Sequence, residues 1–266
     1  MKAKSLAHVR AKAEKGDAQS QYELGRTFAK GSLGVAKDEA EAVKWYRKAA
    51  EQNDAKAQCI LGACYGFGHG VPKDYVEAMK WYRKAAEQKH PVAQFSLGVC
   101  YHSGQGVAKN SVEAVKWWRK AAEQNLANAQ HKLGVCYGCG QGVTKDEAEA
   151  VKWYRKAAEQ NQADAQYNLG LCYTLGDGVA KDAAQAVKWY RKAAEQNHAD
   201  AQYDLGRCYA LGEGLAKDYV EAYKWYLLAA GQGEAHAKRA LSLVEPSLTR
   251  AQIAEGQTLA HNFKTR

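Results

Sequence analysis

Several features that are common in proteins are missing from this sequence. Proline is scarce, with 3 residues in 266, whereas Ala, Leu, Lys, Glu and Gln are frequent, and this balance favours helices. No apolar run approaches the roughly 20 residues that a helix needs to cross a bilayer, so we expect no membrane span. The stretch MKAKSLAHVRAKAEKGD at 1–17 has neither an apolar core nor a small-residue cleavage site. We therefore expect no secretory signal and a cytoplasmic location.

A pattern of paired cysteines is also missing. The chain has 7 cysteines, an odd number, which favours reduced thiols in the absence of a signal peptide. Five of them recur at a fixed spacing, namely Cys64, Cys100, Cys136, Cys172 and Cys208. Equivalent positions on packed neighbouring helices lie about 8–10 Å apart, whereas a disulfide needs Cα atoms within about 7 Å. We therefore expect buried free thiols in this column.

Groups that could hold a metal or perform catalysis are not apparent either. Cys136 and Cys139 form one C-x-x-C without a second ligand pair, so we expect no metal or redox site. Nothing assembles a nucleophile, a base and an orienting group. We expect the remaining histidines to share no structural position, and these are His69, His90, His102 and His198. The protein is therefore predicted to have no enzymatic activity and no cofactor.

What the sequence does contain is a repeat. The stretch AVKWYRKAAEQN occurs whole at 42–53, 150–161 and 186–197, with close variants at 78–89, 114–125 and 222–233. Its tryptophans recur every 36 residues, at Trp45, Trp81, Trp117, Trp153, Trp189 and Trp225. Self-similarity at this period indicates a helical solenoid. We expect six repeats over 17–233, an N-terminal capping helix over 1–16 and C-terminal capping helices over 234–266.

The first half of each repeat predicts a helix, which we call helix A. Its signature is A-Q-x-x-L-G, and at helical spacing Ala57, Leu61 and Cys64 share one buried stripe. Gly62 and its equivalents cost about 1 kcal/mol each in helix propensity, which suggests a close approach by a neighbouring backbone. The following glycine-rich turns, such as GQGV at 104–107, lack the preceding strand of a phosphate-binding loop. They are predicted to supply positive φ at a helix end.

The second half of each repeat predicts helix B, which begins at an Asp or Asn cap. Asp38 precedes Glu41 by the spacing of a capping box, and equivalent pairs recur in the other repeats. Within the helix, an apolar face follows the i, i+3, i+4, i+7, i+8 pattern of a core. Its members in the first repeat are Ala42, Trp45, Tyr46, Ala49 and Ala50. Asn53 and its equivalents are expected to end the helix in the left-handed conformation.

The outer face of helix B is basic, and the formal net charge of the chain is +9. Lys44, Arg47 and Lys48 recur, but Glu41 and Glu51 stand within three or four residues of them, so we expect a self-neutralising face. Binding of nucleic acid would need aromatic side chains interleaved with the positive ones. The aromatic residues are predicted to point the other way, so nucleic acid is not the expected partner.

The last repeat departs from this outer pattern. It has Leu227, Leu228 and Gly231 where the others have Arg, Lys and Glu. Apolar residues on an outward face need a cover, and the segments 234–246 and 247–263 are candidates for a helical cap over the two leucines. The alternative is a dimer patch, although we expect a monomer.

The repeat resembles the Sel-1-like repeat, a relative of the tetratricopeptide repeat. The resemblance covers about 17–233 and is carried in the second repeat by Leu61, Gly62, Tyr65, Gly68, Gly70, Val71, Lys73, Asp74, Ala78, Trp81, Tyr82, Ala85 and Ala86. It implies an all-α fold, a right-handed α/α superhelical solenoid of helix-turn-helix repeats that scaffolds protein complexes. Some cysteine-rich relatives are secreted, disulfide-bonded and linked to β-lactams or cell-wall compounds. Binding or hydrolysis of such compounds is therefore the alternative function, although this chain lacks a cysteine pair in each repeat.

Positions that vary between repeats are free to perform a local function. On helix A, two sets of equivalent positions face away from the predicted core, and a third set flanks them. We call each such set a column. The candidate partner-binding residues from these columns are Tyr22, Arg26, Phe95, Val99, His131, Val135, Tyr167, Leu171, Tyr203 and Arg207, with Lys132, Asn168 and Asp204 from the third. A concave helix-A face of this composition suits a bound peptide or protein. Alternatively, the first two columns pack against the next helix A, and the third is the more exposed.

Overall fold

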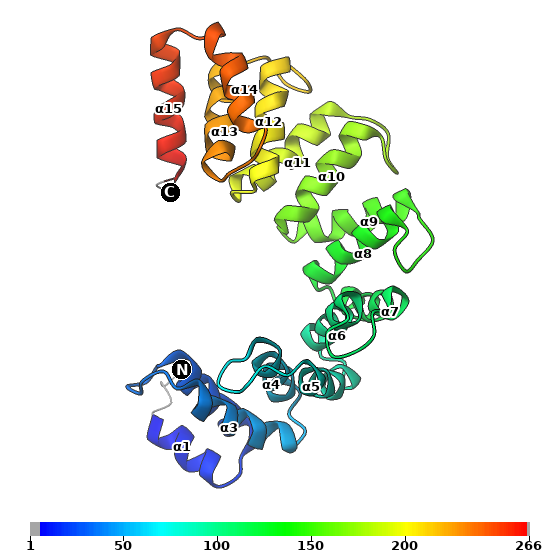
Figure 1. Ribbon diagram of the computed structural model, residues 1–266, viewed down its shortest axis with the longest axis vertical. Coiled ribbons are helices and arrows are strands. Elements are labelled where there is room, and N and C mark those ends of the chain that lie inside the picture. Colours follow the sequence, from blue (N-terminus) through cyan, green and yellow to red (C-terminus); the bar gives the residue numbers. More distant parts are fainter. Residues whose placement is uncertain (1–5, 265–266) are drawn as a thin grey trace. The chain divides into compact units, whose positions relative to one another are not determined.

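In the computed structural model, residues 6–264 are described, and they form α-helices with one short 3-10 turn and no strand (Figure 1). The predicted all-α class is confirmed. The helices are α1 (Leu6–Glu14), α2 (Ala18–Lys30), α3 (Glu39–Glu51), α4 (Ala55–Phe67), α5 (Tyr75–Glu87), α6 (Pro91–Ser103), α7 (Ser111–Glu123), α8 (Ala127–Cys139), α9 (Glu147–Glu159), α10 (Ala163–Leu175), α11 (Ala183–Glu195), α12 (Ala199–Leu211), α13 (Tyr219–Gly231), α14 (Ala237–Val244) and α15 (Arg250–Lys264).

Consecutive helices pack as pairs, with α2, α4, α6, α8, α10 and α12 as helix A and the next odd-numbered helix as helix B. The chain divides into two compact units. The first comprises residues 1–129 and 141–143, and the second comprises 130–140 and 144–266, so the division falls inside α8. Each interaction described below lies within one unit.

The predicted caps define the helix ends. Asp38 accepts a hydrogen bond from the Glu41 backbone N–H at 2.8 Å, and this side chain satisfies a donor that the helix itself leaves free. The other end of α3 is followed by Asn53, whose φ is +68°, and α4 ends at Gly68 with φ +78°. Both residues are in the left-handed region, as the sequence predicts.

The helix-A glycines make room for an aromatic ring. A Cβ on Gly62 would stand 2.7 Å from a ring carbon of Tyr82 and 3.1 Å from the Ala78 carbonyl oxygen. The main neighbour of this glycine is therefore the helix-B tyrosine of the same repeat. The backbone approach that the sequence predicts is present, but it is the more distant of the two contacts. Closer backbone approaches occur instead at the turns, where, for example, a Cβ on Gly106 would lie 2.3 Å from the carbonyl oxygen of Tyr75 in the preceding repeat.

The two aromatic residues of helix B have different partners. Tyr82 packs on Gly62 of its own repeat and joins a buried cluster that extends to Leu97 of the next one. Trp81 instead joins a buried cluster with Ala42 and Leu61 that belongs largely to the repeat before it. The predicted core face of α3 is confirmed, because each of its five members is buried. The tryptophan ring nevertheless meets a basic side chain, since the Lys48 ammonium lies over the Trp45 ring at 4.1 Å from its centroid. The prediction that the aromatic residues point away from the lysines is thus wrong for the tryptophans.

A buried amide ladder explains the glutamine of the A-Q-x-x-L-G signature. Gln58 is 1% exposed, and its side-chain amide donates to the Ala50 carbonyl of the preceding repeat at 3.1 Å. It also accepts from the Gln88 amide on helix B of its own repeat at 2.8 Å. Equivalent pairs join Gln52 to Gln21, Gln124 to Gln94, Gln160 to Gln130, Gln196 to Gln166 and Gln232 to Gln202.

Helices at both ends cover the apolar faces of the terminal repeats. Val9 and Ala13 of α1 are buried in a cluster with Trp45. At the other end, α14 and α15 pack on α13. Leu228 is 1% exposed in a cluster with Ala260 of α15. Leu227 packs against a second buried cluster that includes Tyr226 and Val244 of α14, as do Leu241, Leu248 and Ile253. The outward leucines of the last repeat are thereby covered by the chain's own C-terminal helices.

Candidate functional site

The aromatic column of helix A is half-buried and packs between repeats. In the second unit, the Tyr167 ring stacks on the His198 ring of the next repeat at 4.8 Å, and its hydroxyl donates to Asp204 at 3.2 Å. Leu171 packs against the same buried cluster as Tyr167. Of the two alternatives that the sequence left open, packing against the next repeat therefore describes these two side chains.

The third column is less exposed than expected. Asn168 lies 3.0 Å from the His131 ring nitrogen, and the Asp204 side chain is only 13% exposed where it meets Arg207 at 3.3 Å. Burial raises the pKa of Asp204, although Arg207 acts against that shift. Lys132 alone among the candidates of this column is exposed. The expectation of exposure is therefore wrong for Asp204, because the arginine one turn away draws it into a polar network.

The remaining candidates divide between packing and surface roles. The Arg26 guanidinium lies 5.8 Å above the Tyr22 ring, which in turn lies 6.0 Å from the Tyr46 ring. Tyr203 sits 5.7 Å from the ring of Tyr226, and Val135 packs on the cluster around α9 and α10. These contacts stabilise the helix pairs and leave only part of each side chain accessible.

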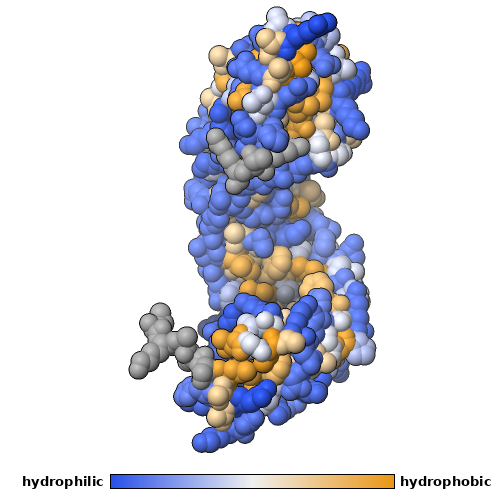
Figure 2. Space-filling model, turned by 90° about the vertical axis from the view of Figure 1, so that its left-hand side faces the viewer, coloured by the Kyte–Doolittle hydropathy of each residue, from blue (hydrophilic) through white to orange (hydrophobic). Residues whose placement is uncertain are grey.

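Phe95 and Val99 differ, because they line a cavity. A cavity of about 250 Å³ lies between α4, α5 and α6 in the first unit, and we call it the α4–α6 hollow. Phe67, Tyr75 and Tyr82 form the rest of its aromatic wall, and Lys73 is at its edge. Phe67 is 71% exposed, far more than any side chain of the buried clusters. Hydrophobic side chains also gather in patches, bordered by hydrophilic ones, on the face drawn in Figure 2.

Sequence reasoning missed Phe67, Lys73 and Tyr75. The signal that could have revealed them is Gly66, which stands where the third and fifth repeats have His102 and Thr174. A small residue at that position next to an outward phenylalanine indicates an unfilled space.

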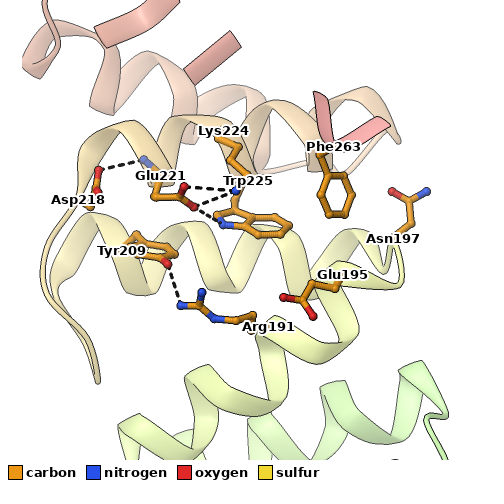
Figure 3. Close-up of a pocket in the computed structure, with 9 residues that line it drawn as sticks. All are labelled: Arg191, Glu195, Asn197, Tyr209, Asp218, Glu221, Lys224, Trp225 and Phe263. Atoms are coloured by element: carbon orange, nitrogen blue, oxygen red, sulfur yellow. Dashed lines mark hydrogen bonds and ion pairs between the residues drawn. The ribbon is translucent and has the colours of Figure 1, made fainter. Parts of the chain in front are cut away.

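A second kind of groove lies between successive B helices. In the second unit, α11, α13 and the end of α15 enclose about 800 Å³ (Figure 3). Figure 3 shows that several of its polar groups pair with one another: Arg191 donates to the Tyr209 hydroxyl at 2.7 Å, and Glu221 accepts from the Trp225 indole at 3.0 Å. The Phe263 ring lies edge-on to Trp225 at 5.4 Å. A similar groove of about 520 Å³ occurs beside Trp117 in the first unit, so this shape is a recurring product of the repeat.

The basic face of helix B is engaged within the protein. Lys44 pairs with Glu41 at 2.9 Å, as the sequence predicts. Arg47 instead donates to the Tyr65 hydroxyl of the next repeat, and Lys48 lies over the Trp45 ring. The sequence predicts Glu51 as the partner of both residues, but in the structure their partners are aromatic side chains. Arg47 therefore joins neighbouring repeats, whereas the two lysines are engaged within their own helix.

Two histidines share a structural position, which corrects the sequence prediction. His90 and His198 both cap a helix A: their Nδ1 atoms accept from the Ala93 and Ala201 backbone N–H groups, each at 3.3 Å. In the second repeat Asp54 performs this function for Ala57 at 2.7 Å. The three residues stand at equivalent positions, so the histidines are explained as helix caps.

The cysteine column is buried, as predicted, and its members are free thiols. Burial raises the pKa of Cys64 and Cys100 to about 11, which keeps both thiols protonated near neutral pH. Across residues 6–264, no three His, Cys, Asp or Glu side chains come together to hold a metal ion. Within the same residues, no helix combines the length and the apolarity that crossing a membrane requires.

These features define an α-helical repeat protein in which, within each unit, successive helix pairs pack on one another. The Sel1 repeat matches the chain six times in succession, over 18–54, 55–90, 91–126, 127–162, 163–198 and 199–234. The chain therefore belongs to the Sel1 repeat family.

Solved structures agree with this assignment. A Sel1 repeat protein from Oxalobacter formigenes is 36% identical with a TM-score of 0.77, over 90% of this chain and 96% of that one. A protective antigen of uropathogenic Escherichia coli with the same repeat fold is 32% identical with a TM-score of 0.64. That match covers 97% of this chain but only 63% of the antigen. Among curated proteins, none reached the level of a match.

Proposed function

We propose that this protein is a non-catalytic scaffold that binds a protein or peptide partner through helix A of its repeats. Sel1 repeats commonly mediate protein–protein interaction, and the chain carries six of them. The observation that supports this location is the α4–α6 hollow, where Phe95 and Val99 of helix A line an open apolar space. Exposed apolar surface bordered by polar residues is typical of interaction sites.

Within this proposal, Phe95 and Val99 are the primary contacts. Tyr22, Arg26, Tyr203 and Lys132 contribute their accessible edges, because their packing leaves them partly exposed. The remaining candidates are secondary contacts, and their main role is to hold neighbouring repeats together. They are His131, Val135, Tyr167, Leu171, Asn168, Asp204 and Arg207.

We also propose that the protein works in a reducing compartment such as the cytoplasm. The cysteines are free, and those of the column are buried. In this respect the chain differs from the disulfide-bonded relatives. The alternative function, which is binding of β-lactams or cell-wall compounds, rests on the resemblance to those relatives. The far-UV circular dichroism spectrum and the melting temperature should therefore be the same with and without a reducing agent. Loss of structure under reduction would contradict this part of the proposal.

The binding proposal is tested by affinity capture from native lysate with mass spectrometry. The double variant Phe95→Ala, Val99→Ala removes the apolar wall, and Val112→Ala is the control because Val112 is a 52% exposed apolar residue on helix B. We expect a partner that is retained by the wild type and the control but lost by the double variant. A partner captured equally by all three proteins would exclude the helix-A site.

A further inference from the structure

The α4–α6 hollow lies at a position that the third and fifth repeats fill with a larger side chain. In the fifth repeat, the Thr174 hydroxyl lies 2.8 Å from that of Tyr190, and in the third the His102 ring lies 5.3 Å from Trp118. The second repeat has Gly66 at this position. A Cβ there would stand 3.8 Å from both the Ala78 Cβ and the Tyr82 hydroxyl oxygen, which is ordinary contact distance. The missing side chain therefore leaves usable space.

The size and walls of the hollow favour one aromatic ring. Its volume of about 250 Å³ lies below the range of roughly 300–1,000 Å³ that is typical of small-molecule pockets, so it suits a single side chain. Phe67, Tyr75 and Phe95 contribute aromatic rings from three different helices or helix ends. Aromatic pairs gain energy from edge-to-face or offset stacking at about 4.5–7 Å. A guest ring gains such contacts on several sides.

Lys73, which lines the hollow, lacks the glutamate that two of the other five repeats carry two residues after the equivalent lysine. Equivalent lysines in the first and fourth repeats, Lys37 and Lys145, pair with Glu39 at 2.7 Å and Glu147 at 2.6 Å. In the second repeat Tyr75 replaces that glutamate, and the Lys73 ammonium lies over its ring at 4.6 Å from the centroid. Lys73 is also the one charged side chain among the described residues that line the hollow. A carboxylate carried by a guest would restore the missing ion pair.

We propose that the α4–α6 hollow receives an aromatic side chain from an acidic segment of a partner protein, with a flanking carboxylate on Lys73. The inference rests on the proposed function and specifies the partner's chemistry. The formal net charge of +9 on the whole chain also favours an acidic partner. The guest ring takes the place that His102 and Thr174 occupy in their own repeats, and its neighbouring acid takes the place of the absent glutamate.

The test uses fluorescence polarisation with labelled, capped pentapeptides. The probe is Asp-Glu-Phe-Glu-Asp, and its controls are Asp-Glu-Ala-Glu-Asp and Lys-Lys-Phe-Lys-Lys. We expect the probe to bind the wild-type protein at least about tenfold more tightly than either control, because each control lacks one of the two contacts. Equal affinity for the alanine peptide, equal affinity for the lysine peptide, or no binding of the probe would overturn the proposal.

Protein variants locate the binding. Gly66→Thr fills the hollow in the way that Thr174 fills its equivalent, and Gly66→Ala is a smaller second choice. Gly138→Thr is the matched control, since a Cβ on Gly138 has the same surroundings, 3.7 Å from the Tyr154 hydroxyl oxygen and 3.8 Å from the Ala150 Cβ. We expect Gly66→Thr to weaken probe binding about tenfold and Gly138→Thr to leave it unchanged. Equal binding by both would reject the site.

Lys73→Gln tests the ion pair separately. We expect it to weaken binding of the acidic probe about threefold and to reduce the dependence of binding on salt. An unchanged salt dependence would show that Lys73 does not meet the carboxylate. Affinity capture with Gly66→Thr distinguishes this inference from the proposed function. A partner that is lost by Phe95→Ala, Val99→Ala but retained by Gly66→Thr would leave the scaffold function standing and exclude the aromatic guest.

Discussion

The side-chain amide of Gln88 donates a 2.8 Å hydrogen bond to the side-chain oxygen of Gln58, which links helix B to helix A within one repeat. Gln58 also donates to the Ala50 carbonyl of the previous repeat. One buried side chain thus connects three helices, and its loss leaves buried polar groups without their partners. This relationship leads to the first prediction.

Gln58→Ala should destabilise the first unit by about 2–3 kcal/mol, because a buried carbonyl and an amide both lose a hydrogen bond. Gln88→Ala should cost about 1 kcal/mol, since Gln88 is exposed and water replaces its contact. Urea denaturation followed by circular dichroism gives the two values. Equal losses for the two variants would contradict the role of the ladder.

Two glycines of α4 should respond to alanine in opposite ways. Gly62→Ala places a Cβ 2.7 Å from the Tyr82 ring, and this overlap should cost about 1–3 kcal/mol. Gly66→Ala meets only ordinary contacts at 3.8 Å and should stabilise the helix by up to about 1 kcal/mol. Melting temperatures of the two variants check the prediction. A shift in the same direction for both would show that the ring does not approach Gly62.

Much of this architecture was predictable from the sequence, because the repeat displays each structural requirement six times. The caps, the core face of helix B and the turn glycines all follow from local chemistry that acts over a few residues. The role of Gly62 was harder, since the sequence shows that space is needed but not whether a backbone or a ring fills it. Asp204 was misjudged for a similar reason, because its burial depends on Arg207 and on Tyr167 of the preceding repeat.

The stability of the folded protein should depend on pH because of His90. Burial lowers the pKa of His90, and the nearby Lys56 acts in the same direction while Asp54 opposes it. The folded protein therefore binds this proton less readily than the unfolded chain, whose histidine pKa is about 6.5. Stability should be constant above that pH and should fall below it, by up to about 1.4 kcal/mol per pH unit.

The control for this pH dependence comes from the chain itself. Asp54 caps the helix of the second repeat with a carboxylate, so His90→Asp should preserve the cap. Urea unfolding of both proteins between pH 5 and 8 gives the comparison. We expect the variant to lose less stability than the wild type as the pH falls from 6.5 to 5. Parallel curves would mean that His90 does not contribute.

Thiol chemistry should single out Cys139. It is the exposed cysteine, whereas burial raises the pKa of Cys172 and Cys208 to about 11 and shields both from reagents. An aromatic disulfide reagent at pH 8 should therefore modify one of the 7 thiols quickly and the others only after denaturation. In Cys139→Ser the fast phase should disappear. A fast phase that persists would show that the column thiols are accessible.

The contacts of the tryptophans and the turn glycines give the array a direction. Trp81 reaches back to the repeat before it, and the turn at Gly106 rests on the start of α5 in the preceding repeat. Each repeat therefore has a donor side and an acceptor side, as the monomers of a head-to-tail polymer do. Insertion or deletion of one whole repeat preserves every type of joint. The two terminal caps cover opposite ends of such an array, so each has to fit a different side of a repeat.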